Sequence, residues 1–356
     1  MKHVYTSIFT LALLAISSNS FAQGPNGSGE YYKPADGKKG ETLKTALCGI
    51  IYSRNEGGSL DNAYKAIWTH FKTTDVRSDG KVWDLYSSIT NYDFDSDRDP
   101  GNYIKDGDKS KKEGKYFNRE HSWPNSWFGA KVMPMYTDLH HVYPTDKSVN
   151  EDRGNKPFGE TNGSKNSAEN FSKIGTCTYS GYTGTVFEPN DIYKGDLART
   201  YFYMVTCYEE KIADWYTNYG VNNDDPNKVE TKNAVLATLD GTSYHAFQDW
   251  QLEMLMKWAK NDPVSADKEI PRNNAVYGIQ GNRNPFIDYP GLEEYIWGSL
   301  TDVAFSYDNY QSPTAIMTIK AEPTYKEGVM YNLAGQVVDK SYKGIVIMNG
   351  KKFVNK

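Results

Sequence analysis

Two motifs in the first half of the chain constrain the fold more than any other feature. The first is NREHSWPNSWFG (118–129) and the second is TDLHHVYPTDKSVNEDRGN (137–155). The first motif predicts a strand that carries Glu120 and His121, and the second begins with another short strand, DLHHVY. The order of these motifs therefore predicts two neighbouring strands joined by a loop.

The second predicted strand is followed by signals for a helix. Pro144 ends the strand, Thr145 or Asp146 can cap the N-terminus of a short helix, and Gly154 can terminate it. Asn150 lies inside this helix. The sequence thus predicts a compact strand–strand–helix (ββα) unit.

Side chains in this unit can supply the parts of a metal-dependent hydrolytic site. The Glu120 carboxylate and the Asn150 side-chain carbonyl are hard oxygen ligands, which suit Mg²⁺ with added water better than zinc. His121 is then free to take a proton from water. Arg153 lies three residues after Asn150, on the same helix face, and could hold a phosphate. Phosphodiester hydrolysis needs these parts.

The same residues also have structural interpretations. A Glu-His pair can be an incidental contact, a histidine such as His140 beside a strand is usually structural, and the RGN tripeptide at 153–155 can simply end a helix. Each residue alone is weak support for catalysis. Their combination in this order favours the catalytic interpretation.

A basic segment precedes the first motif, although the formal net charge of the chain is −5. Residues 105–119 contain five lysines and one arginine against three acidic residues. This segment is either a solvated loop or a surface that contacts a nucleic-acid backbone. The candidate substrate-binding residues are Lys111, Lys112, Lys115 and Arg119.

Composition shifts divide the chain into five parts. The first 22 residues have a charged start, a short apolar run and SFA before Gln23, which predicts a secretory signal peptide. No later stretch is long and apolar enough to cross a bilayer. The predicted parts are a signal peptide (1–22), a flexible leader (23–40), a main domain (41–298), a linker (299–313) and a region of short alternating strands (314–356).

The spacing of apolar residues predicts that the main domain is mostly helical. Helices are expected over 41–71, 196–216 and 246–260, and a strand over 82–92. The stretch DFDSDRDPG (93–101) lacks the glycine and the final glutamate of an EF-hand, so we interpret it as a solvated turn. In the tail, Asn349–Gly350 predicts a hairpin turn. The predicted fold class is α+β.

Cysteine usage is sparse. The chain has Cys48, Cys177 and Cys207, which allow at most one disulfide within the chain. No Cys-x-x-Cys pair is present, which argues against a structural zinc site. A hydrophobic core must therefore stabilise the fold.

The two motifs, together with IQGNRNPFIDYP (279–290), resemble the bacterial endonuclease I family. These are secreted or periplasmic non-specific nucleases of the ββα-metal (His-Me finger) superfamily. The resemblance covers residues 41–298 and implies a mainly helical nuclease domain with a ββα-metal finger at its active site. It also implies that Glu120 and Asn150 hold the metal and that His121 is the general base.

The resemblance extends to supporting residues, with some departures. Asn155 falls in the family's RGN segment, and Asn282, Arg283 and Asn284 fall in its QGNxNP segment, where support for the active-site wall is expected. Some relatives carry an arginine between the two motifs that is thought to hold the cleaved phosphate. Here Lys131 is the only cation at that place, so Arg153 is the candidate substitute. Tyr136 stands where some relatives have a glutamate, and those relatives have several disulfides.

The tail GVMYNLAGQVVDKSYKGIVIMNGKKFVNK (328–356) resembles a sorting domain of the type IX secretion pathway. Such domains are small β-sandwiches that direct export across the outer membrane. The resemblance implies the type IX machinery as a partner. An ordinary accessory β-domain is the alternative.

The whole sequence predicts a Mg²⁺-dependent endonuclease that cleaves DNA and RNA, with Mn²⁺ or Ca²⁺ as alternative ions. It is expected outside the cell or on its surface, or in the periplasm if the tail is not a sorting domain. One alternative is a non-catalytic surface module that binds nucleic acid or glycan. Another is a phosphodiesterase for a small substrate. The oligomeric state and the preference between DNA and RNA stay open.

Overall fold

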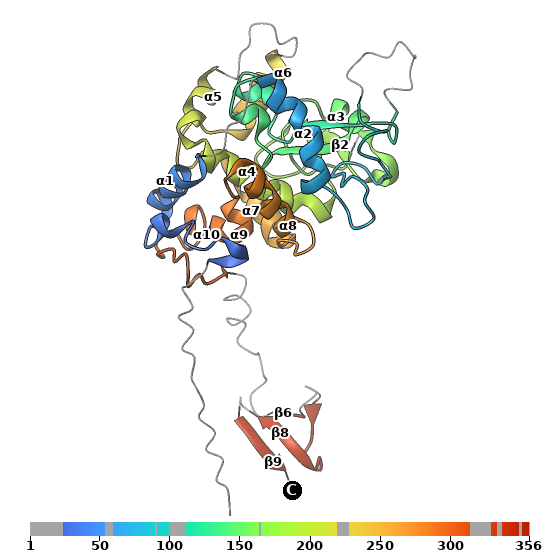
Figure 1. Cartoon of the computed structure of the whole chain (residues 1–356). Coiled ribbons are helices and arrows are strands. Elements are labelled where there is room, and N and C mark those ends of the chain that lie inside the picture. Colours follow the sequence, from blue (N-terminus) through green and yellow to red (C-terminus); the bar gives the residue numbers. More distant parts are fainter. Residues whose placement is uncertain are drawn as a thin grey trace, which may run out of the picture.

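A computed structural model describes residues 24–53, 60–89, 91–99, 112–163, 165–218, 228–313, 329–332, 337–348 and 351–355. The predicted signal peptide and Lys111 lie outside these residues. Most of the described chain forms one mainly helical body with small sheets (Figure 1). Over the described ranges, no helix has both the length and the apolar composition needed to cross a membrane.

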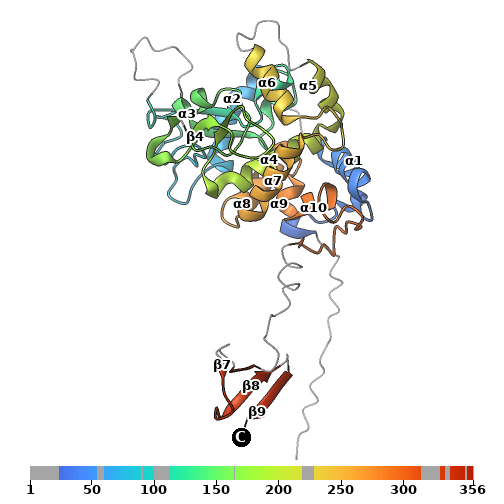
Figure 2. The same ribbon diagram turned by 180° about the vertical axis from the view of Figure 1, so that it is seen from behind.

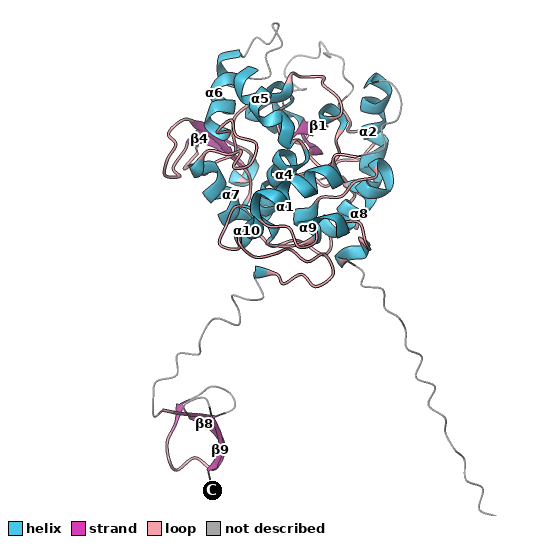
Figure 3. Cartoon of the chain, turned by 90° about the vertical axis from the view of Figure 1, so that its left-hand side faces the viewer, coloured by secondary structure: helices cyan, strands magenta, loops and turns pink. Residues whose placement is uncertain are grey.

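The helical body is built around α4 (Lys194–Cys207), in which every residue is buried. A helix that is surrounded on all sides belongs in a protein core. Helices α1, α7 and α9 pack against it, and Figure 3 shows α4 at the centre of the body. The other helices are α1 (Gly40–Ile51), α2 (Leu60–Thr74), α3 (Lys147–Arg153), α5 (Ile212–Asn218), α6 (Lys228–Thr238), α7 (Asp249–Asn261), α8 (Glu269–Gln280), α9 (Pro285–Asp288) and α10 (Leu292–Ile296).

The main core is rich in aromatic side chains and reaches the first motif. Trp123 and Trp127 are fully buried, with ring centroids 5.2 Å apart. The Trp123 ring also lies 4.9 Å from Tyr201 of α4. The tryptophans of the first motif are therefore core residues that fix the motif to the central helix.

Two small sheets belong to the body. Strand β1 (Phe117–His121) pairs antiparallel with β2 (Val142–Asp146), so that Glu120 lies opposite Tyr143, and α3 follows β2 directly. This is the predicted order of two strands and a helix. A second sheet contains β3 (Lys165–Asn166), β4 (Lys173–Thr176) and β5 (Thr185–Glu188). In the view from behind, α3 and β4 lie on the same side of the body (Figure 2).

The C-terminal region forms a four-stranded sheet in the order β7-β6-β8-β9. Its strands are β6 (Met330–Asn332), β7 (Val337–Val338), β8 (Gly344–Met348) and β9 (Lys351–Asn355). The expected turn at Asn349–Gly350 lies outside the described residues. The pairing of Met348 with Lys351 in antiparallel β8 and β9 is the register that a two-residue turn requires.

Several predicted elements differ from the structure. The segment 41–71 contains two helices, α1 and α2, and the segment 196–216 is divided into α4, a 3₁₀ turn at Glu209–Lys211 and α5. The strand expected over 82–92 is wrong for the described part of that segment, where Val82 makes only an isolated bridge to Val76. The Asp84 carboxylate accepts hydrogen bonds from the backbone N–H groups of Tyr86 and Asp146. These bonds to a side chain take the place of the backbone pairing that a strand would make here.

The second strand of the motif also begins later than expected. His140 and His141 lie in the turn before β2, and Pro144 lies inside β2 instead of ending it. A proline is tolerated there because each strand of a two-stranded sheet has one unpaired edge.

The expected flexible leader and linker are both wrong where they are described. Tyr32 is fully buried and its hydroxyl donates to Asp288, 2.8 Å away. Phe305 is also buried, and its backbone pairs with Gly37 and Lys38. Single aromatic side chains anchor these polar segments to the body, so apolar periodicity did not reveal them. The three cysteines all lie in described segments and are free thiols there.

Candidate active site

The side chains of β1 alternate between two neighbouring helices, as the pleat of a strand requires. Asn118 faces α3, because its side-chain oxygen accepts a hydrogen bond from Asn150 Nδ2 at 2.8 Å. Glu120 faces the same way and forms an ion pair with Arg153. Arg119 instead lies over the ring of Tyr64 in α2. The end of β1 is therefore held between α2 and α3.

The position of α3 follows from its two ends. The Asp146 carboxylate accepts the backbone N–H of Val149 at 2.8 Å, which confirms it as the N-cap. Gly154 ends the helix with φ of 56°, a backbone conformation that favours glycine. Its N–H donates to the carbonyl of Asn150 at 3.0 Å. These caps hold Asn150 beside β1.

Glu120 is almost completely buried, with 3% of its surface exposed. Its Oε1 atom accepts a hydrogen bond from the Tyr86 hydroxyl at 2.8 Å and also contacts Arg153. No hydrogen bond between described residues ends on Oε2. One oxygen of the carboxylate is thus anchored by the protein, and the other is available to a ligand.

Arg153 lies inside the protein instead of on a substrate surface. Besides Glu120, its guanidinium donates to the carbonyls of His121 at 3.0 Å and Ser122 at 2.6 Å and to the Tyr201 hydroxyl at 3.3 Å. Burial alone would lower the pKa of Arg153, but Tyr86 and Glu120 raise it, so the guanidinium stays charged. To hold a phosphate, as the sequence suggested, Arg153 would have to leave these partners. Its geometry favours positioning of Glu120 and of the end of β1.

The imidazole of His121 is oriented by a backbone carbonyl. Its Nε2 atom lies 3.0 Å from the oxygen of Tyr136, and because a carbonyl can only accept, Nε2 carries the hydrogen. Nδ1 is then the nitrogen that can accept a proton. The ring also stacks on Tyr136, with centroids 5.0 Å apart. Burial, with a contribution from His141, lowers the pKa of His121 to about 3, so the ring is neutral.

The predicted substrate-binding cations occupy different surroundings. Arg119 is half-buried: it donates to the Tyr64 carbonyl at 2.7 Å, and its guanidinium lies 3.5 Å from the Tyr64 ring centroid and 4.5 Å from that of Trp68. Burial lowers the pKa of Arg119. Lys112 and Lys115 are exposed, as is Lys131. Arg119 is therefore held against α2, and the described lysines remain accessible.

The predicted supporting residues hold the turn before β2. His140 Nε2 lies 3.1 Å from the carbonyl of Asn282, and the Asn282 amide donates to the Tyr203 hydroxyl at 2.8 Å. Tyr203 in turn donates to Asp138, which also accepts from Gln280. His140 and Asn282 thus belong to one buried network beneath the site.

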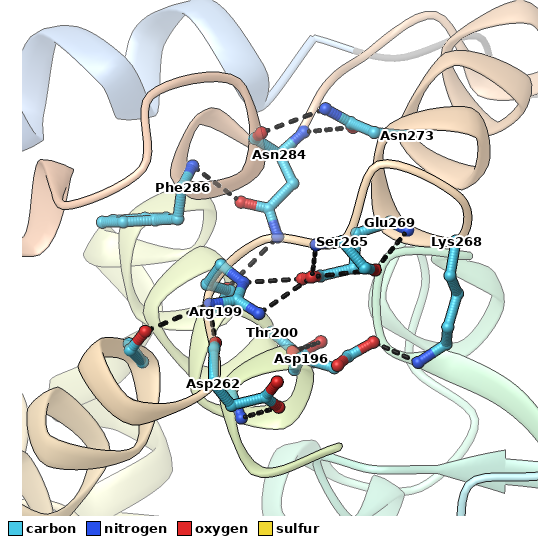
Figure 4. Close-up of polar contacts among 12 residues, drawn as sticks. Asp196, Arg199, Thr200, Asp262, Ser265, Lys268, Glu269, Asn273, Asn284 and Phe286 are labelled. Carbon is cyan, nitrogen blue, oxygen red and sulfur yellow. Dashed lines mark hydrogen bonds and ion pairs between the residues drawn. The ribbon is translucent and has the colours of Figure 1, made fainter. Parts of the chain in front are cut away.

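Arg283, Asn284 and Asn155 join separate helices. Arg283 pairs with Asp288 at 2.7 Å. Asn284 accepts from the N–H of Phe286, donates to the carbonyl of Arg199, and exchanges hydrogen bonds with Asn273 (Figure 4). These contacts hold α4, α8 and α9 together. Asn155 donates to Thr231 at 3.1 Å, which connects the end of α3 to α6.

The sequence did not reveal the roles of three residues that shape the site. Asn118 orients Asn150, Tyr86 anchors Glu120, and Tyr136 orients His121. The period of two along a strand places Asn118 on the same face as Glu120, so this signal could have found it. Tyr86 lies 34 residues before Glu120, and no local pattern joins the two.

The donors at this position fit a hard divalent cation. In the described part of the chain, no group of three or more His, Cys, Asp or Glu side chains is arranged to hold a metal ion. The available donors are Oε2 of Glu120 and Oδ1 of Asn150, whose Nδ2 is turned toward Asn118. Magnesium is commonly bound by few protein oxygens, with water and substrate phosphate as its other ligands.

Comparisons with known proteins identify the family to which the main domain is similar. A sequence model of the Endonuclease I family matches residues 39–291. An extracellular ribonuclease of Bacillus subtilis (strain 168) is 35% identical over 272 residues, which cover 75% of this chain and 78% of the relative. An extracellular ribonuclease of Bacillus amyloliquefaciens is 34% identical, with the same shares covered. Endonuclease-1 of Buchnera aphidicola subsp. Baizongia pistaciae (strain Bp) is 25% identical over 42% of this chain and 46% of its own length.

Proposed function

Because this chain belongs to the endonuclease I family and is therefore a nuclease, we propose that it is a secreted, Mg²⁺-dependent endonuclease that hydrolyses phosphodiester bonds of DNA and RNA. The observation that carries the proposal is the orientation of His121, whose Nδ1 can accept a proton at the end of β1. Glu120 precedes His121 on β1, and Asn150 of α3 contacts Asn118 of the same strand, so that β1, β2 and α3 would form the ββα-metal finger.

The divalent metal would be held by Glu120 and Asn150. When bound, it supplies positive charge that stabilises the charge developing on the phosphate and the leaving oxygen. Arg153 and Tyr86 keep Oε1 of Glu120 in place, and Asn118 directs the amide oxygen of Asn150. The protein therefore sets the direction of both donors before substrate binds.

His121 would remove the proton from the attacking water. Its Nε2–H remains bound to the Tyr136 carbonyl while Nδ1 accepts the proton, so the ring keeps its orientation during the transfer. The low pKa of the buried ring keeps Nδ1 unprotonated before the reaction. The exposed Lys112 and Lys115 would attract the nucleic-acid backbone.

Removing the metal is expected to abolish cleavage. EDTA should stop plasmid nicking and RNA cleavage by the purified chain, and added Mg²⁺ should restore both activities. Trials with Mn²⁺ and Ca²⁺ would identify the preferred ion. Cleavage that continues in EDTA would contradict the proposed metal dependence.

Asn118→Ala is expected to raise the Mg²⁺ concentration needed for half-maximal activity by about 10- to 100-fold, because Asn118 orients a metal-holding side chain. Asn150→Ala should raise it further. Asn261→Ala, an exposed asparagine at the end of α7, is the control. A Mg²⁺ titration measures all three variants, and unchanged titrations for Asn118→Ala and Asn150→Ala would contradict the site.

The sequence of residues 1–22 and the extracellular relatives support secretion. We also propose that the C-terminal sheet, β6 to β9, is a sorting domain that engages the type IX machinery. Its alternating strands support this assignment, and no residue of the candidate active site belongs to it.

The chain truncated after Ser312 is expected to fold and to cleave DNA but to remain unexported in its host. A chain that ends after Trp297 lacks the buried Phe305 and should unfold more easily, by about 3 kcal/mol or more. Nuclease assays and thermal melts of both chains test this difference. A folded but inactive chain ending at Ser312 would mean that the tail builds part of the site.

A further inference from the structure

A cavity of about 760 Å³ opens at the start of α6. Its volume lies in the range typical of sites for small ligands. Its wall includes the apolar side chain of Val229, which is 74% exposed, and the ring of Tyr182, which stacks on Trp250 with centroids 4.7 Å apart. Lys156, Lys228 and Asn233 add polar groups. The cavity thus combines apolar and aromatic surface with cations and an amide.

Two sets of contacts connect the wall of this cavity to elements of the candidate active site. Helix α6 packs against the 3₁₀ turn η4 (Asn125–Phe128), which follows His121 closely in the chain. Lys156 Nζ contacts Glu230 of α6 at 3.1 Å and the last carbonyls of α3. The chain from Asn150 to Arg153 is helical and continues through a turn to Lys156, so the Cα atoms of Asn150 and Lys156 are at most about 15 Å apart.

We infer that this cavity is a subsite for one nucleotide of the substrate strand, a few positions from the cut. This inference rests on the proposed nuclease function. Bases of any kind stack on aromatic and apolar surfaces such as Tyr182 and Val229. Lys228 is exposed, forms no ion pair with a described residue, and attracts a phosphate. The exposed Asn233 amide can bind a base edge.

The charge balance of the cavity agrees with an anionic occupant. Lys156 is paired with Glu230, whereas Lys228 forms no ion pair with any described residue. Of the two lysines in the wall, Lys228 is therefore the one whose charge is available to an anion among the described residues. A nucleotide that enters with its base first would place its phosphate at Lys228.

Binding of a labelled single-stranded DNA to the full chain carrying His121→Ala, in Mg²⁺, tests the subsite. Adding Lys228→Glu is expected to raise Kd by about 3- to 10-fold and to reduce the slope of log Kd against log salt by about one. Adding Asn233→Ala is expected to raise Kd by about 5-fold or more. Both side chains are exposed, so neither change disturbs the core. Lys260→Glu, an exposed lysine of α7 outside the cavity, is the matched charge control.

Cleavage of the same DNA by the wild-type chain is measured first. If the wild-type chain does not cut this DNA in the presence of Mg²⁺, both the proposed function and the subsite are contradicted. If the wild-type chain cuts the DNA, wild-type Kd values for both Lys228→Glu and Asn233→Ala would overturn the subsite alone. An equal loss of affinity with Lys260→Glu would also overturn it, because the effect would then be one of net charge.

Discussion

His121→Ala is expected to slow phosphodiester cleavage by about 10²- to 10⁴-fold while nucleic-acid binding persists. The imidazole is held by the Tyr136 carbonyl with Nδ1 as its only acceptor nitrogen, and alanine offers no replacement for it. The proposed metal donors, Glu120 and Asn150, remain in place, so binding of metal and substrate should survive. Single-turnover cleavage and DNA binding, measured on the same preparation, separate the two effects.

His245→Ala is the matched control, because His245 is a partly exposed histidine that pairs with Asp240, outside the candidate active site. This variant should cleave DNA at the wild-type rate. A His121→Ala chain that also cleaves at that rate would show that another group is the base. Loss of folding in His121→Ala, visible in a thermal melt, would call for His121→Gln as the replacement test.

Arg153→Ala is expected to lower the free energy of unfolding by about 3–5 kcal/mol, because it leaves the buried Glu120 carboxylate without its cation. The double variant Glu120→Gln with Arg153→Met removes both charges and should recover much of this stability, but not the activity. Urea unfolding measures the stability of each variant. The comparison separates the cost of an unpaired charge from a loss of packing.

The same variants decide between the two roles of Arg153. If Arg153 positions Glu120, Arg153→Ala should lose stability and require more Mg²⁺ for activity. If Arg153 holds the phosphate, as the sequence suggested, Arg153→Ala should remain stable and show a defect in turnover or substrate affinity. A stable variant with an unchanged requirement for Mg²⁺ would therefore contradict the positioning role.

The ββα unit could be predicted because its signals are local. Asp146 caps α3, Gly154 ends it, and Asn150 faces β1 within one helical turn of both. Short-range capping and turn chemistry depends on neighbouring residues, so it can be read along the sequence. The location of Glu120 and His121 on β1 and of Asn150 on α3 follows from the same local signals.

The partners of these residues could not be predicted, since they come from distant segments. Arg153 reaches Glu120 and the carbonyl of Ser122, and Tyr86 reaches Glu120 from a segment that the sequence suggested was a strand. The spacing of Arg153 and Asn150 shows that they share a helix face, but not whether that face meets solvent or β1. Burial of the guanidinium is a tertiary property that only the folded body reveals.

The contacts between the beginning and the end of the body have a consequence for the order of folding. Tyr32 bonds to Asp288 across 256 residues, and Asp36 accepts the N–H of Tyr307 across 271. Neither contact can form on a ribosome or in a translocation channel until the last part of the body has emerged. The N-terminal segment therefore stays unpacked until then. It packs late because bringing residues so far apart in the chain together has a large cost in loop-closure entropy. The N- and C-terminal ends of the body can therefore be joined only after nearly all of the body has been synthesised.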